Sequence, residues 1–235
     1  MAESFYKPYV EVLADLFYPQ RCVGCDRRAS DVLCRPCFEA LPFVGHPFCG
    51  RCGAPTAFEV YGCGECRDRD FGFEGARAPL RYEGVGKELV HALKYKGYLR
   101  VVEKVMAPLM AGALSGYSGD GRFDAVVPVP LHRSRLARRG FNQAELMAGG
   151  VAKRISAPVL DKLRVVRRTR DQVELSAGAR RANVAGAYAS RGPVAGRVLL
   201  LDDVFTTGAT LSECAGVLRR AGAGEVHALT LCRTC

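Results

Sequence analysis

The sequence predicts an α/β protein in which a parallel β-sheet is flanked by helices and preceded by a small cysteine-rich unit. Eight of the eleven cysteines lie between Cys22 and Cys66, and from Phe71 onward the composition becomes ordinary for a globular protein. In this second part short apolar runs alternate with stretches of helical period, the pattern of parallel strands joined by crossover helices. One apolar run, residues 198–201, ends in two adjacent carboxylates followed by a loop of small and hydroxyl residues.

Length and composition set the outer bounds of this prediction. The 235 residues, 49% hydrophobic and 25% charged, suffice for a medium domain and a small one. No apolar stretch approaches the ~20 residues that span a bilayer. Residues 1–18 carry a single base, Lys7, and lack the pattern of a secretory signal. We therefore expect a cytoplasmic protein with a helix in 1–19, the cysteine-rich unit in 20–70 and the sheet domain in 71–235.

The clustered cysteines form four Cys-x-x-Cys pairs. Pairs at this spacing supply the thiolates of tetrahedral zinc, and a reducing compartment disfavours the alternative of disulfides. Eight thiolates make two four-cysteine zinc sites, which are structural because a closed thiolate shell leaves no open position. A sequential partition of the cysteines between the two ions is favoured, and an interleaved one is compatible with the sequence. The expected ligands are Cys22, Cys25, Cys34, Cys37, Cys49, Cys52, Cys63 and Cys66.

Strands and helices are expected in alternation along the sheet domain. The apolar runs predict strands over residues 77–82, 123–129, 158–163, 197–201 and 225–231. The helical periods predict helices over 85–95, 99–114 and 142–155, and a last one that ends near Ala221, where Gly222 suits a C-cap. Residues 164–182 are charged and have no apolar period.

The loop after residues 197–201 carries the strongest functional signal. Residues 206–210 offer backbone N–H groups and hydroxyls at the start of a helix, where anions such as phosphate bind. Asp202 and Asp203 would repel that anion and suit vicinal hydroxyls or a metal ion. The sequence therefore predicts a ribose 5-phosphate ligand at the carboxyl edge of the sheet. The expected binding residues are Asp202, Asp203, Thr206, Thr207, Gly208, Ala209 and Thr210.

Basic residues are concentrated in the sheet domain. The net charge is +10, and the fifty residues from His132 to Arg181 contribute +9 of it, from thirteen bases and four acids. Two arginine-rich clusters follow predicted strand ends, so we expect them on the ligand side of the sheet, where guanidinium groups bind phosphate oxygens. The clusters are Arg133, Arg135, Arg138 and Arg139, and Lys162, Arg164, Arg167, Arg168 and Arg170.

The Asp-Asp pair and the Thr-Thr-Gly-Ala-Thr sequence resemble the phosphoribosyl-pyrophosphate (PRPP) loop of type I phosphoribosyltransferases. More narrowly, the whole chain resembles the ComF family, whose members join a cysteine-rich zinc ribbon to a phosphoribosyltransferase-like domain. The matching segments, in the same order, are residues 82–84, 93–97, 128–132, 139–143, 172–183 and 201–210. The resemblance implies a type I phosphoribosyltransferase-like sheet, a role in DNA uptake during natural competence, and partners among the competence proteins.

In the enzymatic hypothesis the chain binds PRPP with Mg²⁺ and transfers the phosphoribosyl group to an acceptor that the sequence does not identify. Asp202 and Asp203 would hold the ribose hydroxyls beneath the cationic transition state. Arginines of the two clusters would stabilise the leaving pyrophosphate, and those expected in this role are Arg133, Arg139 and Arg170. Lys94, Tyr95 and Lys96 either read the acceptor or are plain surface residues.

The alternative hypothesis is a non-catalytic binding module. Its basic side would track single-stranded DNA, with Tyr95, Tyr98 and Phe141 as stacking faces, and its PRPP loop would be a sensor or a remnant. The acidic pair favours a sugar ligand at the loop, but both hypotheses can hold in one protein, and the oligomeric state is open. Cys214 is expected in the core, and Cys232 and Cys235 are assigned no function.

Overall fold

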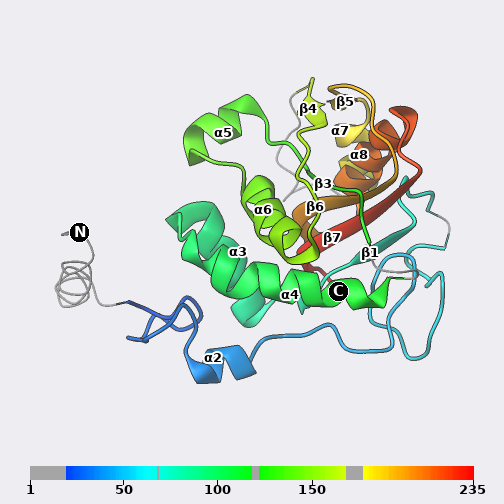
Figure 1. The fold of residues 1–235 in the computed structure, drawn as a ribbon. Coiled ribbons are helices and arrows are strands. Elements are labelled where there is room, and N and C mark those ends of the chain that lie inside the picture. Colours follow the sequence, from blue (N-terminus) through cyan, green and yellow to red (C-terminus); the bar gives the residue numbers. More distant parts are fainter. Residues whose placement is uncertain (1–19, 68, 118–121, 168–176) are drawn as a thin grey trace.

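The structure is a computed structural model that describes residues 20–67, 69–117, 122–167 and 177–235 (Figure 1). The helix predicted over 1–19 lies outside these residues. The described cysteine-rich part consists of turns, isolated bridges and the short helix α2 (Arg35–Glu39).

A parallel sheet forms the centre of the second part, as predicted. Strands β1 (Gly75–Arg77), β7 (Glu225–Arg233), β6 (Arg197–Phe205) and β3 (Ala125–Pro128) are neighbours in this order, and every pair is parallel. Strand β2 (Leu80–Arg81) also pairs with β7. Strands of a parallel sheet are covered on both faces, which is why they occur in the sequence as continuous apolar runs.

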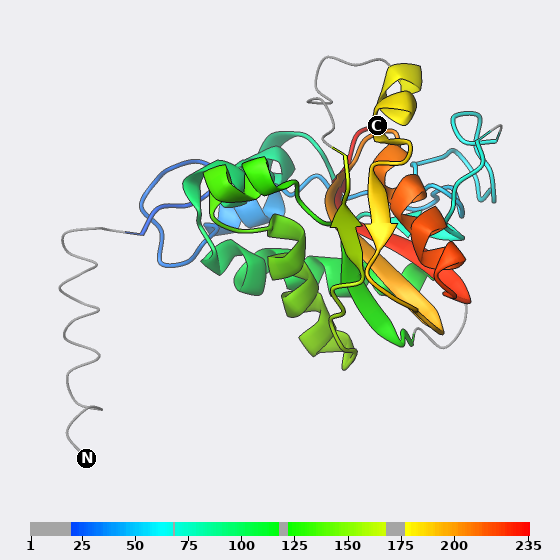
Figure 2. The same cartoon turned by 90° about the horizontal axis from the view of Figure 1, so that it is seen from above.

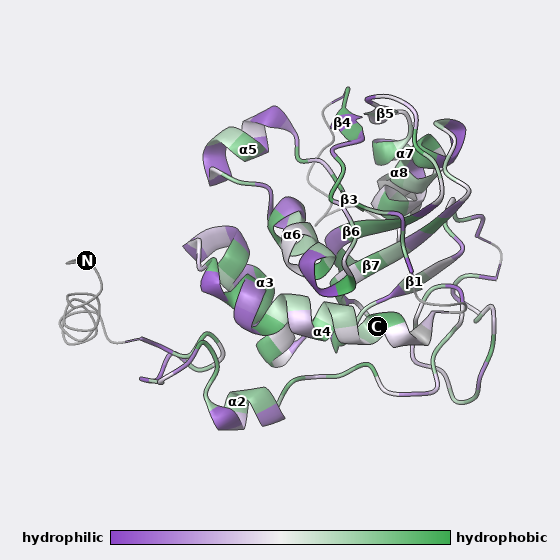
Figure 3. Ribbon diagram, in the orientation of Figure 1, coloured by the Kyte–Doolittle hydropathy of each residue, from purple (hydrophilic) through white to green (hydrophobic). Residues whose placement is uncertain are grey.

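Helices cover both faces of this sheet. Helices α3 (Gly84–Lys96), α4 (Ala107–Gly112) and α6 (Gln143–Ile155) lie on one face, and α8 (Ala209–Arg220), with α7 (Ala177–Val184) beside it, on the other (Figures 1 and 2). Alternate residues of β6 separate the two layers: Leu199 and Leu201 pack with the first set of helices, and Val198 and Leu200 with α8. Figure 3 shows the hydrophobic residues along these central strands.

Two predicted elements are interrupted by proline. The helix predicted over 99–114 is a π-helical turn (Val102–Met106), then α4, then a 3₁₀ turn (Ala113–Gly116). Pro108 has no N–H with which to continue a regular ladder, and Ala107 donates its N–H to the carbonyl oxygen five residues earlier. The strand predicted over 77–82 is divided into β1 and β2, because Pro79 cannot donate and its carbonyl accepts from Val44 at 2.8 Å.

The region between α6 and β6 differs most from the prediction. The strand predicted over 158–163 is wrong: Val159 makes a single bridge with Val126, and the strand is β4 (Leu163–Val165). It pairs antiparallel with β5 (Tyr188–Ser190), outside the main sheet. Helix α5 (Arg133–Arg139) was not predicted, because it contains no buried residue and therefore has no apolar period.

Helices α6 and α8 begin and end close to their predicted bounds. Asn142 caps α6 by accepting a hydrogen bond from the N–H of Ala144 at 3.0 Å. Gly150 weakens α6 locally but lets α4 approach, since a Cβ there would lie 2.7 Å from that of Ala107. Helix α8 ends at Arg220 with Ala221 as its C-cap, and Gly222 adopts a φ of +108°. Cys214 is buried in α8, as expected.

Candidate functional site

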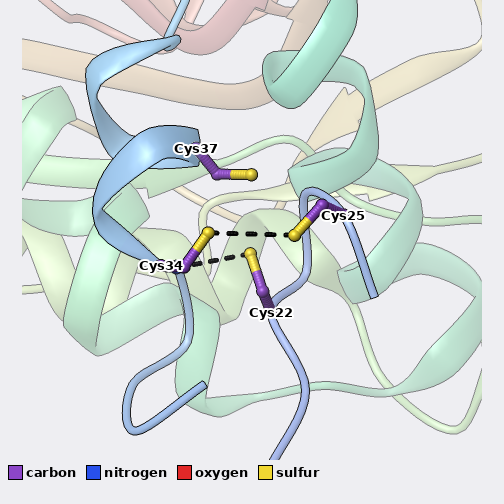
Figure 4. Close-up of side chains that lie close together, drawn as sticks. All are labelled: Cys22, Cys25, Cys34 and Cys37. Atoms are coloured by element: carbon purple, nitrogen blue, oxygen red, sulfur yellow. Dashed lines mark hydrogen bonds between the residues drawn. The ribbon is translucent and has the colours of Figure 1, made fainter. Parts of the chain in front are cut away.

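The eight cysteines of the Cys-x-x-Cys pairs form two clusters, the first four in one and the last four in the other. Within each cluster the four Sγ atoms lie within 4.8 Å of one another, so the interleaved alternative is excluded. Figure 4 shows the first set converging on a common centre. The first cluster is Cys22, Cys25, Cys34 and Cys37, and the second is Cys49, Cys52, Cys63 and Cys66.

Backbone N–H groups favour the thiolate form of one cysteine in each cluster. The N–H of Cys34 donates to Sγ of Cys22 at 3.3 Å, and the N–H of Cys63 donates to Sγ of Cys49 at the same distance. Burial alone would raise the pKa of Cys22, but such backbone hydrogen bonds lower it to about 6. The same balance lowers the pKa of Cys49 to about 7. Because metals bind the thiolate, both clusters fit structural zinc.

Strand β6 extends further than the sequence indicated. It runs to Phe205, so Asp202 and Asp203 are part of the strand, and Asp202 lies in register with Thr230 of β7. Because successive side chains of a strand point to opposite faces, the two carboxylates face different layers. Asp203 contacts Lys94 of α3 and Gln143 of α6, and Asp202 lies on the side of α8, close enough for its charge to act on Cys214.

Asp203 is ion-paired within the protein, which corrects the expectation that both carboxylates are available to hydroxyls or a metal ion. Lys94 Nζ lies 2.7 Å from Asp203 Oδ2, and Gln143 Nε2 donates to the same oxygen at 3.0 Å. The two charged side chains are only 20% and 9% exposed. Burial alone would lower the pKa of Lys94, but the charge of Asp203 and its hydrogen bond raise it. Lys94 is therefore part of the site rather than a plain surface residue.

Within the described part of the chain, Asp202 forms no ion pair of this kind. Its Oδ1 accepts a hydrogen bond from the backbone N–H of Asp203 at 2.9 Å. Burial and the negative charge of Asp203 raise the pKa of Asp202 to about 7, and the charges of Lys94 and Arg139 offset this only in part. A carboxyl with a pKa of about 7 is partly protonated at neutral pH, and a cation bound beside it would favour the ionised form.

The three predicted arginines have different positions. The guanidinium of Arg139 lies 5.9 Å from the ring centroid of Tyr95 and donates to Gln143 Oε1, two contacts from Asp203. Arg133 is exposed in the first turn of α5, and none of the described contacts brings it to the carboxylates. Arg170 lies outside the described residues.

Gln143 is a site residue that the sequence analysis did not single out, although it ends a segment that resembles the ComF family. As the first residue of α6 it follows the Asn142 cap, and this position directs its amide toward both Asp203 and Arg139. The identity of the residue could be read from the motif. Its contact with β6 could not.

The predicted phosphate loop leads directly into the N-terminus of α8. Gly208 is the N-cap and has a φ of +74°, and a Cβ there would lie 2.7 Å from Cζ of Phe205. Only glycine fits this position without strain. Thr207 Oγ1 accepts from the N–H of Ala209 at 3.4 Å. The positive end of the α8 dipole lies at this loop and favours an anion there.

The parallel sheet, the acidic pair at its carboxyl edge and the glycine-fixed threonine loop define a phosphoribosyltransferase-like domain, to which two four-cysteine clusters are joined. The double zinc ribbon domain family matches residues 13–67. DNA utilization protein YhgH of Salmonella typhimurium is 33% identical over 79% of this chain and 84% of its own. The chain belongs to the ComF family.

Two further relatives carry competence names. Competence protein F of Haemophilus influenzae is 29% identical, over 92% of this chain and 98% of its own. Competence protein ComFC of Bacillus subtilis is 26% identical, over 88% and 86%. Both matches span most of each chain.

The likeness to solved structures is weaker. Glutamine PRPP amidotransferase from B. subtilis has a TM-score of 0.36 and 25% identity, over 54% of this chain and 25% of that one. Orotate phosphoribosyltransferase from Aeropyrum pernix has a TM-score of 0.29 and 20% identity, over 63% and 76%. At these scores the likeness carries no argument of its own. Among the described residues, no helix has the length and apolar character to cross a membrane.

Proposed function

We propose that this protein binds PRPP with Mg²⁺ where β6 meets α8, and transfers the phosphoribosyl group to an acceptor. The observation that supports this most is the position of Asp202, a buried carboxyl that forms no ion pair with the described residues. It lies on the same strand end as a helix N-terminus fixed by Gly208. One edge of the sheet thus offers an anion site and a site for hydroxyls or a cation. PRPP carries all of these groups.

Each residue has a role that follows from its surroundings. The N–H groups and hydroxyls of residues 206–210 bind the 5-phosphate. Asp202 binds the ribose hydroxyls or the cation, and it loses its proton when it does so. Lys94 and Gln143 hold Asp203 in place, and Arg139 faces the leaving pyrophosphate. Bound Mg²⁺ supplies positive charge to the pyrophosphate oxygens.

The transfer breaks the bond between C1 of the ribose and the pyrophosphate oxygen, which leaves with the bonding electron pair. A lone pair of the acceptor forms the new bond to C1, and the acceptor then loses a proton. Positive charge on the ribose develops near the carboxylates, and negative charge on pyrophosphate develops near Arg139. Each developing charge is therefore stabilised by a fixed charge of opposite sign.

The test is release of pyrophosphate from PRPP and Mg²⁺ by zinc-loaded protein in the presence of nucleobases and amines. We expect release that Asp202→Asn abolishes. Asp26→Asn is the matched control, because Asp26 is exposed, pairs with Arg21 and has a φ of 59°, which asparagine also tolerates. Binding of PRPP without release under every condition would reject transfer.

Single-strand DNA binding is a second candidate, and α5 favours it. Its seven residues include four arginines, Arg133, Arg135, Arg138 and Arg139, and none of the seven is buried. Tyr95 is 72% exposed beside Arg139 and offers a face for base stacking. Fluorescence anisotropy with an oligo(dT) probe tests it: Arg138→Ala should lower the salt dependence of binding and Tyr95→Ala the affinity, whereas Asp202→Asn should change neither. Unchanged binding in the first two variants would reject this surface.

A further inference from the structure

The second cysteine cluster lies in the same core layer as the phosphate loop. Cys49, Cys52 and Cys66 pack in one hydrophobic cluster with Phe71, Phe205 and the buried residues of α8. Cys22 of the first cluster packs in the other layer, with α3, α4 and α6. The two metal sites therefore contact opposite faces of the sheet. Among the described residues, the second site shares a core layer with the loop that begins α8.

Arg233, the last residue of β7, joins the second cluster to that loop. Its side chain is 2% exposed. One Nη donates to the carbonyl oxygen of Cys52, and the guanidinium lies 5.3 Å from the ring centroid of Phe205. Its Nε is buried and makes no hydrogen bond within the described chain. A buried guanidinium is costly unless an anion lies near it.

With zinc bound, the second cluster would be that anion. Four thiolates around Zn²⁺ carry a formal charge of 2−, and Arg233 is hydrogen-bonded to the backbone of one of these four residues, Cys52. The contacts of Arg233 named above, a carbonyl and an aromatic ring, carry no net charge of their own. Its buried charge and unbonded Nε fit a thiolate–zinc centre next to it.

The aromatic ring that Arg233 touches supports the phosphate loop. Phe205 packs edge-on against both Phe71 and Phe73 at 6.3 Å between centroids, and these two rings stack on one another at 4.7 Å. Phe205 and Phe71 also form the wall against which Gly208 packs. Arg69, which follows the second cluster, adds a direct bond: its guanidinium donates to the carbonyl oxygen of Thr207 at 3.4 Å.

We propose that the second zinc site is part of the phosphate-binding site, with Arg233 as the positioning residue that couples the two. Zinc bound by the second cluster holds Arg233, which holds Phe205 and thereby the conformation of residues 206–210. Zinc bound by the first cluster supports α3, where Gly24 packs between Cys37 and Val85, and has no part in the loop. The ligand named for the loop rests on the proposed function, but the coupling does not.

Hydrogen–deuterium exchange on the full chain without ligand tests the coupling. Cys63→Ser and Cys34→Ser are matched variants, because both remove a partly buried thiol, one from each cluster. Zinc content should fall from two ions to one in each. We expect exchange of residues 203–212 to rise about tenfold or more in Cys63→Ser and to stay at the wild-type rate in Cys34→Ser. Equal rates in the two variants, whether raised or unchanged, would overturn the proposal.

If Cys63→Ser unfolds the domain, β3 and α6 will also lose protection from exchange. Arg233 is therefore tested separately. Arg233→Met should raise loop exchange and zinc loss to a chelator together, and Arg233→Lys, which keeps the charge, should restore part of both. A loop that is unchanged in Arg233→Met contradicts the coupling. In the presence of Mg²⁺, the affinity for PRPP should fall about tenfold in Arg233→Met and stay at the wild-type value in Cys34→Ser. If wild-type protein binds no PRPP, the proposed function fails while the exchange result stands.

Discussion

Replacement of Asp202 by asparagine should stabilise the protein above neutral pH and abolish PRPP binding. Asparagine keeps the shape of the side chain and can accept the hydrogen bond from the N–H of Asp203. It lacks the charge whose burial beside Asp203 raises the pKa of Asp202 to about 7. The native carboxylate is thus held at a cost to stability, which a bound cation or diol would relieve.

The size and sign of this cost follow from the pKa. Asp202 titrates at 3.8 in the unfolded chain and at about 7 in the folded one. Between these values the unfolded state has released the proton and the folded state still holds it, so folding becomes less favourable as pH rises. At about 1.4 kcal/mol per unit the full penalty is about 4 kcal/mol, and about half of it is present at pH ~5.5.

Urea unfolding of zinc-saturated wild type and Asp202→Asn at pH ~5.5 and pH ~8 measures this penalty. The variant should be more stable at both pH values, by about 2 kcal/mol at the lower and up to about 4 kcal/mol at the higher. A variant that is less stable at pH ~8, or an advantage that does not grow with pH, would refute the reasoning. Asp26→Asn, at an exposed carboxylate, should show no such trend.

Three further outcomes are expected. Lys94→Met should lower the free energy of unfolding by about 3–5 kcal/mol, because it leaves Asp203 buried and unpaired, and adding Asp203→Asn should recover most of the loss. Urea unfolding of the wild type, the two single variants and the double variant measures this coupling, and additive effects would contradict it. Binding of PRPP and Mg²⁺ near pH 6.5 should release up to about one proton from Asp202, seen by calorimetry as a dependence on buffer ionisation enthalpy. Gly208→Ala should destabilise by about 1–3 kcal/mol and weaken PRPP binding, whereas Gly149→Ala, in a helix with open space, should stabilise slightly; similar effects at both glycines in thermal unfolding would count against a strained loop.

Much of the fold could be predicted because buried parallel strands leave a plain signal. Residues 123–129, 197–201 and 225–231 are apolar runs that correspond to β3, β6 and β7. The cysteine pairs predicted both clusters, since the ligand type and spacing are local properties of the sequence. Which pairs share a zinc ion depends on how the Cys-x-x-Cys segments fold together, so the structure was needed to decide between the sequential and the interleaved arrangement.

The acidic pair shows where local reasoning stops. The charges of Asp202 and Asp203 suggested that the strand had ended, so both were expected to face one ligand. Pairing with β7 continues the strand to Phe205 and turns the two side chains to opposite faces. The ion pair of Lys94 with Asp203 joins a helix to a distant strand, and no spacing within either segment indicates it. The helix α5 was missed for a different reason: it contains no buried residue, so its sequence has no apolar period to indicate a helix.

The most direct test of this account is calorimetric titration of PRPP with Mg²⁺ into protein that holds two zinc ions. The account predicts saturable binding that is lost in Asp202→Asn/Asp203→Asn and retained in Asp26→Asn. Absence of binding by the well-folded, zinc-loaded wild-type protein would contradict it.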